Sequence, residues 1–593
     1  MNKKTLYIIG SVIFLIFYIF SSFNHVITEY FWFQSENAEP VYWKIFNAKM
    51  FISIAVFALF FGVIYLNLRI ALVATKNRAF QINFNQLKYI DFNKIINIVA
   101  ILVSAFFAFV SAAPSADMWD DVLKFQNSTP FHMKDPVFDY DLGFYFFKLP
   151  LISYIKNLLF SLVFLSLITS GVVYFFKGSI QLVKGWYENF SRNVKLHLGT
   201  LLAILFLLSG FHFWFLRFGM LYSTTGVSTG AGYTDLHTRL FGYNVMAVLF
   251  LLSAPVLIYC IFANRVRLLV AGAMGLSGSV VLFLVLVPVF QQKFLVDPNE
   301  LEKEKPYIVK SIEFTRKAYG LDHVAKADYP LDNTLNEKDL VNYKGTLQNI
   351  RLWDWRPLLN TYRQLQELRL YYTFEDVDVD RYIVNGNYRQ LMLSVRELAY
   401  DQMPEQGQTW VNQRLRYTHG YGLVASPVDR VTREGLPELI IKDIPPVTVP
   451  DLAVTRPGIY YGEKTDDYIF TGTGMDEFDY PLGEDNKLTR YSGKGGVAIG
   501  SIWKRLLYAM EHKSIKILIS EYFTKDTKIL YNRNIRQIIG KIAPFLKYDN
   551  DPYIVIVNGQ LKWIVDAYTT SGQYPYSQQV APGINYIRNS VKV

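Results

Sequence analysis

The sequence predicts a membrane α-helical bundle of seven transmembrane helices, followed by a large α+β extracytoplasmic domain. Hydrophobic residues make up 51% of the 593 residues, and charged residues make up only 19%, against about 25% in a typical soluble protein. Long apolar runs occur only before residue 292, and the remainder mixes helical and strand patterns. This composition excludes a disordered chain and fits a single soluble globule poorly.

Seven apolar runs define a predicted transmembrane domain, because a helix needs roughly 20 apolar residues to cross a bilayer core. The predicted spans cover residues 5–23, 47–67, 95–113, 152–176, 196–218, 240–262 and 268–290, within a domain of residues 1–290. The first run is too long for the apolar part of a signal peptide, so it is predicted to be an uncleaved anchor. Residues 291–306 form a predicted charged stalk. Residues 307–593 form the predicted outer domain, which is large enough for two lobes.

Basic residues in the short loops predict the orientation of the bundle. Thirteen Lys and Arg lie at the N-terminus and in the loops after spans two, four and six, against five on the opposite side. The positive-inside rule therefore predicts a multi-pass plasma-membrane protein with a cytoplasmic N-terminus and residues 291–593 outside the cytoplasm. The net charge of +10 lies mostly in these loops. It indicates membrane orientation, and no nucleic-acid partner is expected.

Local patterns in the outer domain predict two hairpins and a helix. Asn385-Gly386 and Asn558-Gly559 separate apolar runs, and Asn-Gly suits a tight turn in which both central residues need φ > 0. The second hairpin is the stronger prediction because its runs flank the turn more closely. Isoleucines between residues 535 and 542 share one helical face that ends near Pro544.

Acidic residues gather in the predicted outer loop of residues 114–150, and Asp139 and Asp141 are its catalytic candidates. Carboxylates beside a membrane surface can hold a divalent cation or act as general base on a lipid-linked substrate. The other interpretation is structural, with Asx turns around the prolines of this loop. The loop holds Asp117, Asp120, Asp121, Asp135, Asp139 and Asp141.

His419 is the best single catalytic candidate in the outer domain. It lies in the string Thr418-His419-Gly420-Tyr421-Gly422, where a glycine-flanked turn can present an imidazole to a cleft, with Asp429 or Asp443 to orient it. The alternative is a tight turn whose histidine hydrogen-bonds the local backbone. No Gly-x-Ser-x-Gly or His-Glu-x-x-His string occurs, and the only cysteine, Cys260, lies in a predicted span. An enzymatic activity therefore has no motif support.

Asp376, Asp378 and Asp380 are the predicted metal candidates, because they alternate as in the start of a calcium loop. That loop needs Gly at its sixth position and Glu at its twelfth, which here are Arg381 and Asn387. The competing interpretation is a strand with one solvated carboxylate face. The acidic segment 476–485 and the turn 549–551 are looser alternatives. No cofactor is predicted, and calcium or another divalent cation is the alternative that these carboxylates leave open.

Several strings spread over the chain resemble one known family. They are Asp139-Tyr140-Asp141-Leu142-Gly143-Phe144-Tyr145, Arg351-Leu352-Trp353-Asp354, Asp378-Val379-Asp380-Arg381-Tyr382, Tyr417-Thr418-His419-Gly420-Tyr421-Gly422, Lys442-Asp443-Ile444-Pro445-Pro446, Arg456-Pro457-Gly458-Ile459-Tyr460-Tyr461-Gly462-Glu463, Ala543-Pro544-Phe545-Leu546, Asp551-Pro552-Tyr553 and Asn585-Tyr586-Ile587-Arg588-Asn589-Ser590-Val591-Lys592. Together they resemble the uncharacterised protein family (UPF) 0182 of bacterial multi-pass membrane proteins. The resemblance implies seven spans and a large outer region, and it transfers no catalytic residue. Family members usually continue further, so we expect a C-terminally incomplete outer domain whose last strand lacks its partner.

Two functions from different classes follow. The first is a plasma-membrane protein whose outer domain binds an envelope glycan, lipid or membrane protein, beside its contact with the lipid bilayer. Aromatic side chains such as Trp353, Trp355 and Trp410 suit such surfaces. The alternative is a membrane transferase that acts on a lipid-linked envelope substrate through the outer-loop carboxylates, with His419 as a second group. The absence of catalytic motifs favours the first.

Overall fold

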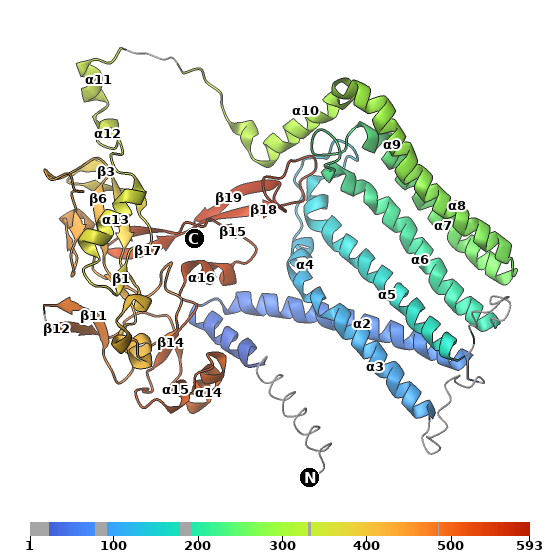
Figure 1. Cartoon of the computed structure of the whole chain (residues 1–593), viewed down its shortest axis with the longest axis horizontal. Helices are drawn as coiled ribbons and strands as arrows, with labels where there is room; N and C mark the ends of the chain where they lie inside the picture. Colours follow the sequence, from blue (N-terminus) through green and yellow to red (C-terminus); the bar gives the residue numbers. More distant parts are fainter. Residues whose placement is uncertain are drawn as a thin grey trace, which may run out of the picture. The chain divides into compact units, whose positions relative to one another are not determined.

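The computed structural model describes residues 23–76, 92–177, 179, 191–329, 334–483 and 485–592. Contacts divide this chain into two compact units that are not consecutive in sequence. The helical unit holds residues 44–325 and 570–588, and the sheet unit holds the described residues up to 43 together with 326–569 and 589–592. The blue-to-green helices of Figure 1 belong mainly to the first unit, and its yellow and orange strands belong to the second.

Six helical segments of the described chain are long and apolar enough to cross a membrane. They run over Glu39–Ala74, Ile95–Gln126, Phe144–Phe176, Arg192–Tyr222, Asp235–Phe262 and Arg267–Ala318. Each contains or overlaps one of the second to seventh predicted spans, and they indicate a membrane protein. The first predicted span, residues 5–23, lies outside the described residues except for Phe23.

The long helices of the helical unit pack against one another (Figure 1). They are α2 (Glu39–Ala74), α3 (Phe92–Ala112), α5 (Leu149–Phe176), α6 (Arg192–Gly219), α7 (Leu240–Phe262) and α8 (Val266–Val281), with the short α4 (Trp119–Gln126) after α3. Helices α6 and α7 approach most closely at glycines. A Cβ atom on Gly199 would lie 2.2 Å from Ile261 Cδ1, and one on Gly210 would lie 2.7 Å from Leu251 Cγ. Small residues thus permit this close approach.

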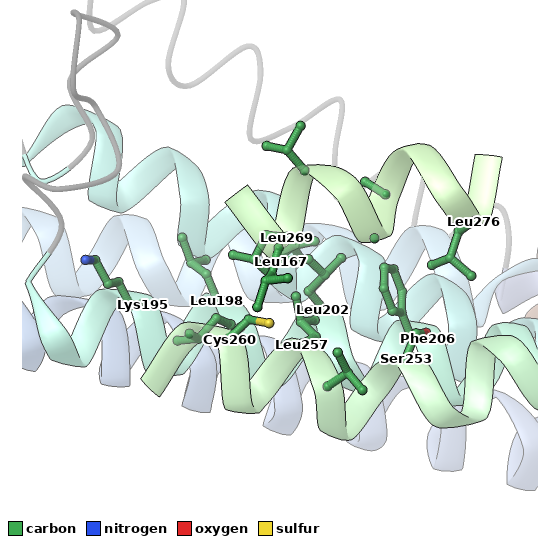
Figure 2. A pocket seen from close by; sticks show the side chains of 17 residues that line it. Leu167, Lys195, Leu198, Leu202, Phe206, Ser253, Leu257, Cys260, Leu269 and Leu276 are labelled. Atoms are coloured by element: carbon green, nitrogen blue, oxygen red, sulfur yellow. The ribbon is translucent and has the colours of Figure 1, made fainter. Parts of the chain in front are cut away.

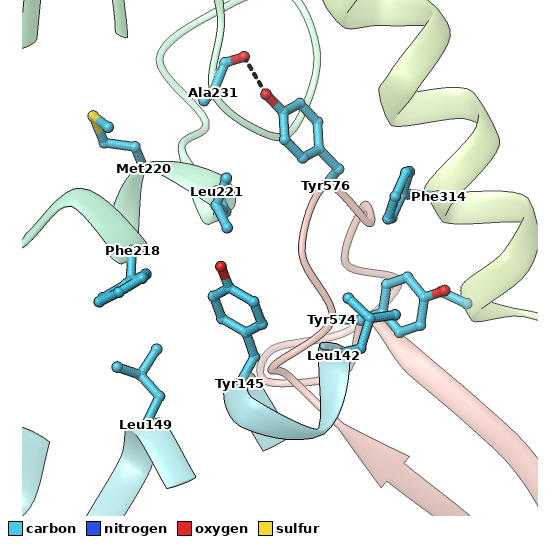
Figure 3. Close-up of a cluster of buried hydrophobic side chains, with 11 residues drawn as sticks. Leu142, Tyr145, Leu149, Phe218, Met220, Leu221, Ala231, Phe314, Tyr574 and Tyr576 are labelled. Atoms are coloured by element: carbon cyan, nitrogen blue, oxygen red, sulfur yellow. Dashed lines mark hydrogen bonds between the residues drawn. The ribbon is translucent and has the colours of Figure 1, made fainter. Parts of the chain in front are cut away.

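The segment predicted as a charged stalk is helical. After α8 the chain continues through α9 (Val287–Gln291) and two short turns into α10 (Glu300–Ala318). Helix α10 takes part in a cluster of buried side chains within the helical unit (Figure 3). In that cluster Tyr576 donates a hydrogen bond to the Ala231 carbonyl at 2.9 Å. The cluster includes Leu142, Tyr145, Phe218, Leu221, Phe314 and Tyr574.

The sheet unit is built around an antiparallel five-stranded sheet in the order β2-β3-β6-β7-β8. These strands are β2 (Asp378–Val384), β3 (Asn387–Val395), β6 (Leu423–Pro427), β7 (Ile441–Lys442) and β8 (Val447–Thr448). Side chains alternate between its faces. Met392 on one face packs with Tyr362 of helix α13 (Trp355–Gln366), whereas Leu391 and Leu393 on the other face join a separate buried cluster.

Short strands and helices complete the sheet unit. The strands are β1 (Tyr372–Thr373), β4 (Glu397–Leu398), β5 (Gly420–Tyr421), β9 (Gly458–Ile459), β10 (Ile469–Thr471), β11 (Glu477–Leu482), β12 (Asp485–Thr489), β13 (Val497–Ala498), β14 (Lys528–Leu530), β15 (Lys547–Tyr548), β16 (Tyr553–Val557) and β17 (Gln560–Ile564). Two further strands, β18 (Asp566–Ser571) and β19 (Tyr586–Lys592), have residues 570–571 and 586–588 in the helical unit and the rest in the sheet unit. The helices are α11 (Glu337–Asn342), α12 (Lys344–Leu347), α14 (Ile502–Glu511), α15 (Lys516–Ile519) and α16 (Ile535–Ile542). Strand and helix are mixed, as predicted.

Both hairpins and the helix predicted from local patterns are confirmed. Strands β2 and β3 turn at Asn385-Gly386, with φ of 50° and 75°, and strands β16 and β17 turn at Asn558-Gly559, with φ of 51° and 74°. Helix α16 buries Ile535 and Ile539. The last strand, β19, has β18 as its neighbour. The prediction that the partner of this strand is missing from the chain is therefore wrong.

The sheet unit also contains a helix from the start of the chain, which the sequence did not predict. Residues 23–35 are helical, and Lys541 Nζ lies 3.0 Å from Glu29 Oε1. Tyr531 donates its hydroxyl to the Thr28 carbonyl at 2.6 Å. These contacts attach the segment that precedes α2 to helix α16 and to the residue that follows strand β14.

Candidate functional site

Three carboxylates meet in the sheet unit at the start of strand β2. Oxygen atoms of Asp376, Asp378 and Asp551 lie within 4.8 Å of one another. Asp376 and Asp378 share one side because residues two apart on an extended chain point the same way. Asp551 precedes β16, which is tied to β2 because the Ile554 amide donates to Asp378 Oδ2 at 2.9 Å. The hairpin β16–β17 thus delivers the third carboxylate.

Glu463 adds a fourth carboxylate to this cluster. Burial and then the charge of Asp376 raise the pKa of Glu463, and Glu463 in turn hydrogen-bonds the Asp376 carboxyl group. The Glu463 side chain is only 10% exposed. The Arg536 guanidinium lies 3.7 Å from Glu463 Oε1. We call Asp376, Asp378, Glu463 and Asp551 the carboxylate cluster.

Ionisation of all the carboxyl groups in the carboxylate cluster is unfavourable, because most of the groups are buried or half-buried and they lie close to one another. Burial and the charge of Asp376 raise the pKa of Asp378 to about 8. Burial and the charge of Asp551 raise the pKa of Asp376, and burial with the charges of Asp376 and Asp378 raises the pKa of Glu463. Carboxylate oxygens are the preferred ligands of calcium, and a bound cation would relieve this repulsion. The donor set fits a hard divalent cation.

The predicted metal residues are thus only partly brought together. Asp376 and Asp378 belong to the carboxylate cluster, and Asp551 comes from the turn 549–551 that the sequence marked separately. Asp380 hydrogen-bonds the Tyr382 hydroxyl and is not among the three clustered aspartates. Asp476 of the acidic segment 476–485 is ion-paired with Arg490 at 2.6 Å.

His419 lies buried beside a stack of aromatic rings. Its ring stacks on Tyr460, with centroids 4.3 Å apart and an interplanar angle of 17°. Nδ1 lies 2.9 Å from Thr418 Oγ1, which donates its proton to Glu477 Oε2 at 2.6 Å. Because that hydroxyl has one proton, Nδ1 is the donor to Thr418, and Nε2 faces Asp479 Oδ1 at 3.4 Å.

The acidic partners of His419 differ from those expected. Asp479 and Glu477 of strand β11 surround the ring. Asp429 is ion-paired with Arg389 at 2.9 Å, and Asp443 accepts a hydrogen bond from Gln366. Asp479 was marked only as part of the acidic segment 476–485 and not as a partner of His419, because this pairing depends on where the β11–β12 hairpin folds.

A groove of about 550 Å³ opens beside His419. Strands β5, β9, β11, β12 and β17 and the segment 456–461 supply its walls. Two ring pairs lie in them, Tyr421 with Tyr480 at 4.8 Å and Tyr460 with Tyr491 at 4.6 Å between centroids. The other lining residues with aromatic or charged side chains are Arg456, Tyr461, Asp479, Lys487, Arg490 and Trp563. We call this site the aromatic groove.

One short segment belongs to both the aromatic groove and the carboxylate cluster. Tyr460 and Tyr461 line the groove, and Glu463 joins the cluster two residues later. Gly462 between them has no room for a side chain, because a Cβ atom would lie 2.3 Å from Glu397 Oε2. Buried Arg533 donates to the Tyr460 carbonyl at 2.8 Å. A cation at Glu463 would therefore also fix this wall of the groove.

The outer-loop candidates Asp139 and Asp141 lie in the helical unit, whereas His419 lies in the sheet unit. Asp141 Oδ1 accepts hydrogen bonds from the backbone amides of Phe131 at 3.0 Å and Gly143 at 2.7 Å. Exposed Asp139 is ion-paired with Lys134 at 2.6 Å. These contacts favour the structural interpretation of the loop.

Asp135 is the buried carboxylate of this loop, and it accepts the Tyr145 hydroxyl at 2.9 Å. Tyr145 points into the buried cluster drawn in Figure 3. Three backbone amides, those of Val137, Phe138 and Tyr140, also donate to Asp135. The sequence placed Asp135 among the loop acids, but no pattern distinguished it from them.

The described residues define a class of protein, in which helices able to span a membrane accompany a sheet-rich unit with a carboxylate cluster and an aromatic groove. The chain belongs to the Uncharacterised protein family (UPF0182), whose model matches residues 6–593. No solved structure matches the chain.

Relatives of the chain carry the same family name. "UPF0182 protein" of Trichodesmium erythraeum (strain IMS101) is 45% identical over 99% of this chain and 66% of its own length. The "UPF0182 protein" of Pelotomaculum thermopropionicum is 42% identical over 95% of this chain and 63% of its own length. That of Clostridium botulinum (strain Loch Maree / Type A3) is 38% identical over 100% and 66%. The chain thus spans slightly less than two thirds of these relatives.

Proposed function

We propose that this chain is a multi-pass plasma-membrane protein whose sheet unit faces the outside of the cell and binds an envelope glycan in the aromatic groove. The groove carries the proposal. The half-buried Tyr480, Tyr491 and Trp563 offer flat apolar faces. They lie beside the polar side chains of Arg456, Lys487 and Asp479. Ligand sites typically combine such surfaces with a few polar groups that fix orientation. The loop charges counted from the sequence support the outward orientation.

Calcium at the carboxylate cluster is the second part of the proposal. Four carboxylates from three separate segments converge there, and burial together with the neighbouring negative charges raises the pKa of Asp378. A bound divalent cation would hold β2, the β16 turn and the segment at Glu463 together. Tyr460 and Tyr461 line the groove and come just before Glu463 in the chain. A cation held by Glu463 would fix the position of these two rings, so glycan binding would be stronger with calcium.

The transferase alternative has less support. Both backbone amides that contact Asp141 Oδ1 already use this oxygen as a hydrogen-bond acceptor. Asp139 is exposed and ion-paired with Lys134. Neither contact resembles the environment of a general base, whose pKa is usually tuned by burial or neighbouring charge.

The proposal is tested by glycan binding to the full chain in detergent. The probes are chitotetraose, maltotetraose and polygalacturonate, with calcium or with a chelator. Tyr480→Ala is expected to weaken binding of the recognised probe about fivefold or more, as for a central contact residue. Tyr388→Ala is the matched control, because Tyr388 is 55% exposed on β3 and lies away from the groove. Equal affinities of the two variants, or no binding of any probe, would contradict glycan binding in this groove.

A further inference from the structure

The helical unit contains an apolar pocket of about 410 Å³ between helices α5, α6, α7 and α8 (Figure 2). Its volume lies within the range of about 300–1,000 Å³ typical of ligand sites. Hydrocarbon side chains make up nearly all of the lining, and Ser253 and Lys195 are its polar exceptions. Prominent lining residues are Leu198, Leu202, Phe206, Leu257, Leu269 and Leu276.

The pocket exists because α8 packs less tightly against its neighbours than α6 and α7 pack against each other. At Gly199 of α6, there is no space for a Cβ atom beside the Ile261 side chain of α7. On α8, by contrast, a Cβ atom on Gly272 would meet nothing within 4 Å, and the same holds for Gly275 and Gly278. Since Gly272 lines the pocket, the open side of α8 faces a space large enough for hydrocarbon.

One end of the pocket is basic. Figure 2 shows Lys195 at that end, with the hydrocarbon lining extending away from it. Lys195 Nζ donates to Asn264 Oδ1 at 2.8 Å, which places the ammonium at the end where α7 finishes and α8 begins. Further basic residues are close in the sequence: Arg192 lies just before Lys195, and Arg265 and Arg267 follow Asn264. Among the described residues that line the pocket, none is acidic.

We propose that this pocket binds one anionic phospholipid, with an acyl chain along the leucines and the phosphate at Lys195. A hydrocarbon slot that ends at a lysine matches the two parts of such a lipid. Basic pockets between transmembrane helices are a known mode of recognition for anionic headgroups. A zwitterionic lipid with the same acyl chains would fill the pocket but bind less tightly, because its headgroup has no net negative charge to interact with Lys195. This binding site is independent of the aromatic groove and of its ligand.

Native mass spectrometry of the full chain in detergent tests the proposal with dioleoyl phosphatidylglycerol and dioleoyl phosphatidylcholine as probes. The unchanged chain is expected to retain the anionic lipid in preference. Lys195→Gln is expected to reduce that preference about fivefold, the effect of one basic group near a bilayer surface. Gly272→Leu is expected to remove retention of one molecule of either lipid by filling the slot.

Gly278→Leu is the matched control, because Gly278 lies on the same helix, has the same open space and is not part of the lining. It is expected to retain lipid like the unchanged chain. Equal retention by Gly272→Leu and Gly278→Leu would overturn the acyl-chain site, and an unchanged lipid preference in Lys195→Gln would overturn the headgroup site. A dimer that Gly272→Leu alone dissociates would overturn the proposal in favour of a second copy in the slot.

Discussion

Asp376 and Asp551 come from distant parts of the sequence, and their carboxyl oxygens lie within 4.8 Å of each other. The β16–β17 hairpin brings Asp551 to this position, because the Ile554 amide in its first strand donates a hydrogen bond to the Asp378 side chain. Two carboxylates at this separation repel each other unless one is protonated or a cation lies near them. We therefore expect protonation of these carboxylates to compete with the proposed cation.

Asp378→Asn is expected to abolish stabilisation by calcium, because it removes a charged ligand from the carboxylate cluster. For the unchanged chain, calcium at a hundredfold excess over Kd should add about 2.7 kcal/mol to the free energy of unfolding. Thermal unfolding of the full chain in detergent, with calcium or EDTA, measures this difference. Asp526→Asn is the control, because Asp526 is exposed and lies outside the carboxylate cluster, and it should respond like the unchanged chain. A calcium response that survives in Asp378→Asn would exclude the cluster as the site.

The response to pH should follow from the raised pKa of Asp378. Its value in the folded chain is about 8, against an ordinary value of 3.8. Without metal, the folded state binds this proton more tightly than the unfolded state does, so stability falls as the pH rises from about 4 through 8. Calcium needs deprotonated carboxylates, and its stabilising effect should therefore increase over the same window.

Unfolding temperatures at pH 5.5 and pH 8.5 test this dependence. The shift caused by calcium should be clearly larger at pH 8.5, and Asp378→Asn should flatten the dependence of the metal-free chain. An equal shift at both pH values would show that these carboxylates do not titrate as a linked group.

The sequence was sufficient for features that depend on neighbouring residues. The six helices of the described chain that are able to cross a membrane follow from the length of each apolar run. The hairpins follow from Asn385-Gly386 and Asn558-Gly559, whose φ values are positive. The carboxylate cluster joins three distant segments, and no local pattern specifies their meeting. His419 was predicted with Asp429 or Asp443, yet Asp479 faces it because the β11–β12 hairpin folds over that ring.

Gly420→Ala is expected to destabilise the sheet unit, since Gly420 is pressed against the chain that precedes β4. A Cβ atom there would lie 2.2 Å from the Arg396 carbonyl oxygen, which cannot rotate away. Overpacking of this kind costs about 1–3 kcal/mol, or about 2–4 °C in Tm per kcal/mol for a unit of this size. Gly407→Ala serves as the control, because a Cβ atom on Gly407 meets nothing within 4 Å. Similar Tm values for the two variants would indicate that the backbone at Gly420 moves easily.

Labelling of introduced cysteines tests the orientation proposed for the sheet unit. Cys260 is buried and is the only cysteine, so Cys260→Ser provides a background without thiols. In this background Glu434→Cys, at an exposed turn of the sheet unit, should react with a membrane-impermeant maleimide in intact cells. Lys76→Cys, just after α2, should react only after the cells are opened, because the positive-inside rule places this basic loop in the cytoplasm. The reverse pattern would put the aromatic groove inside the cell and remove the envelope glycan as its ligand.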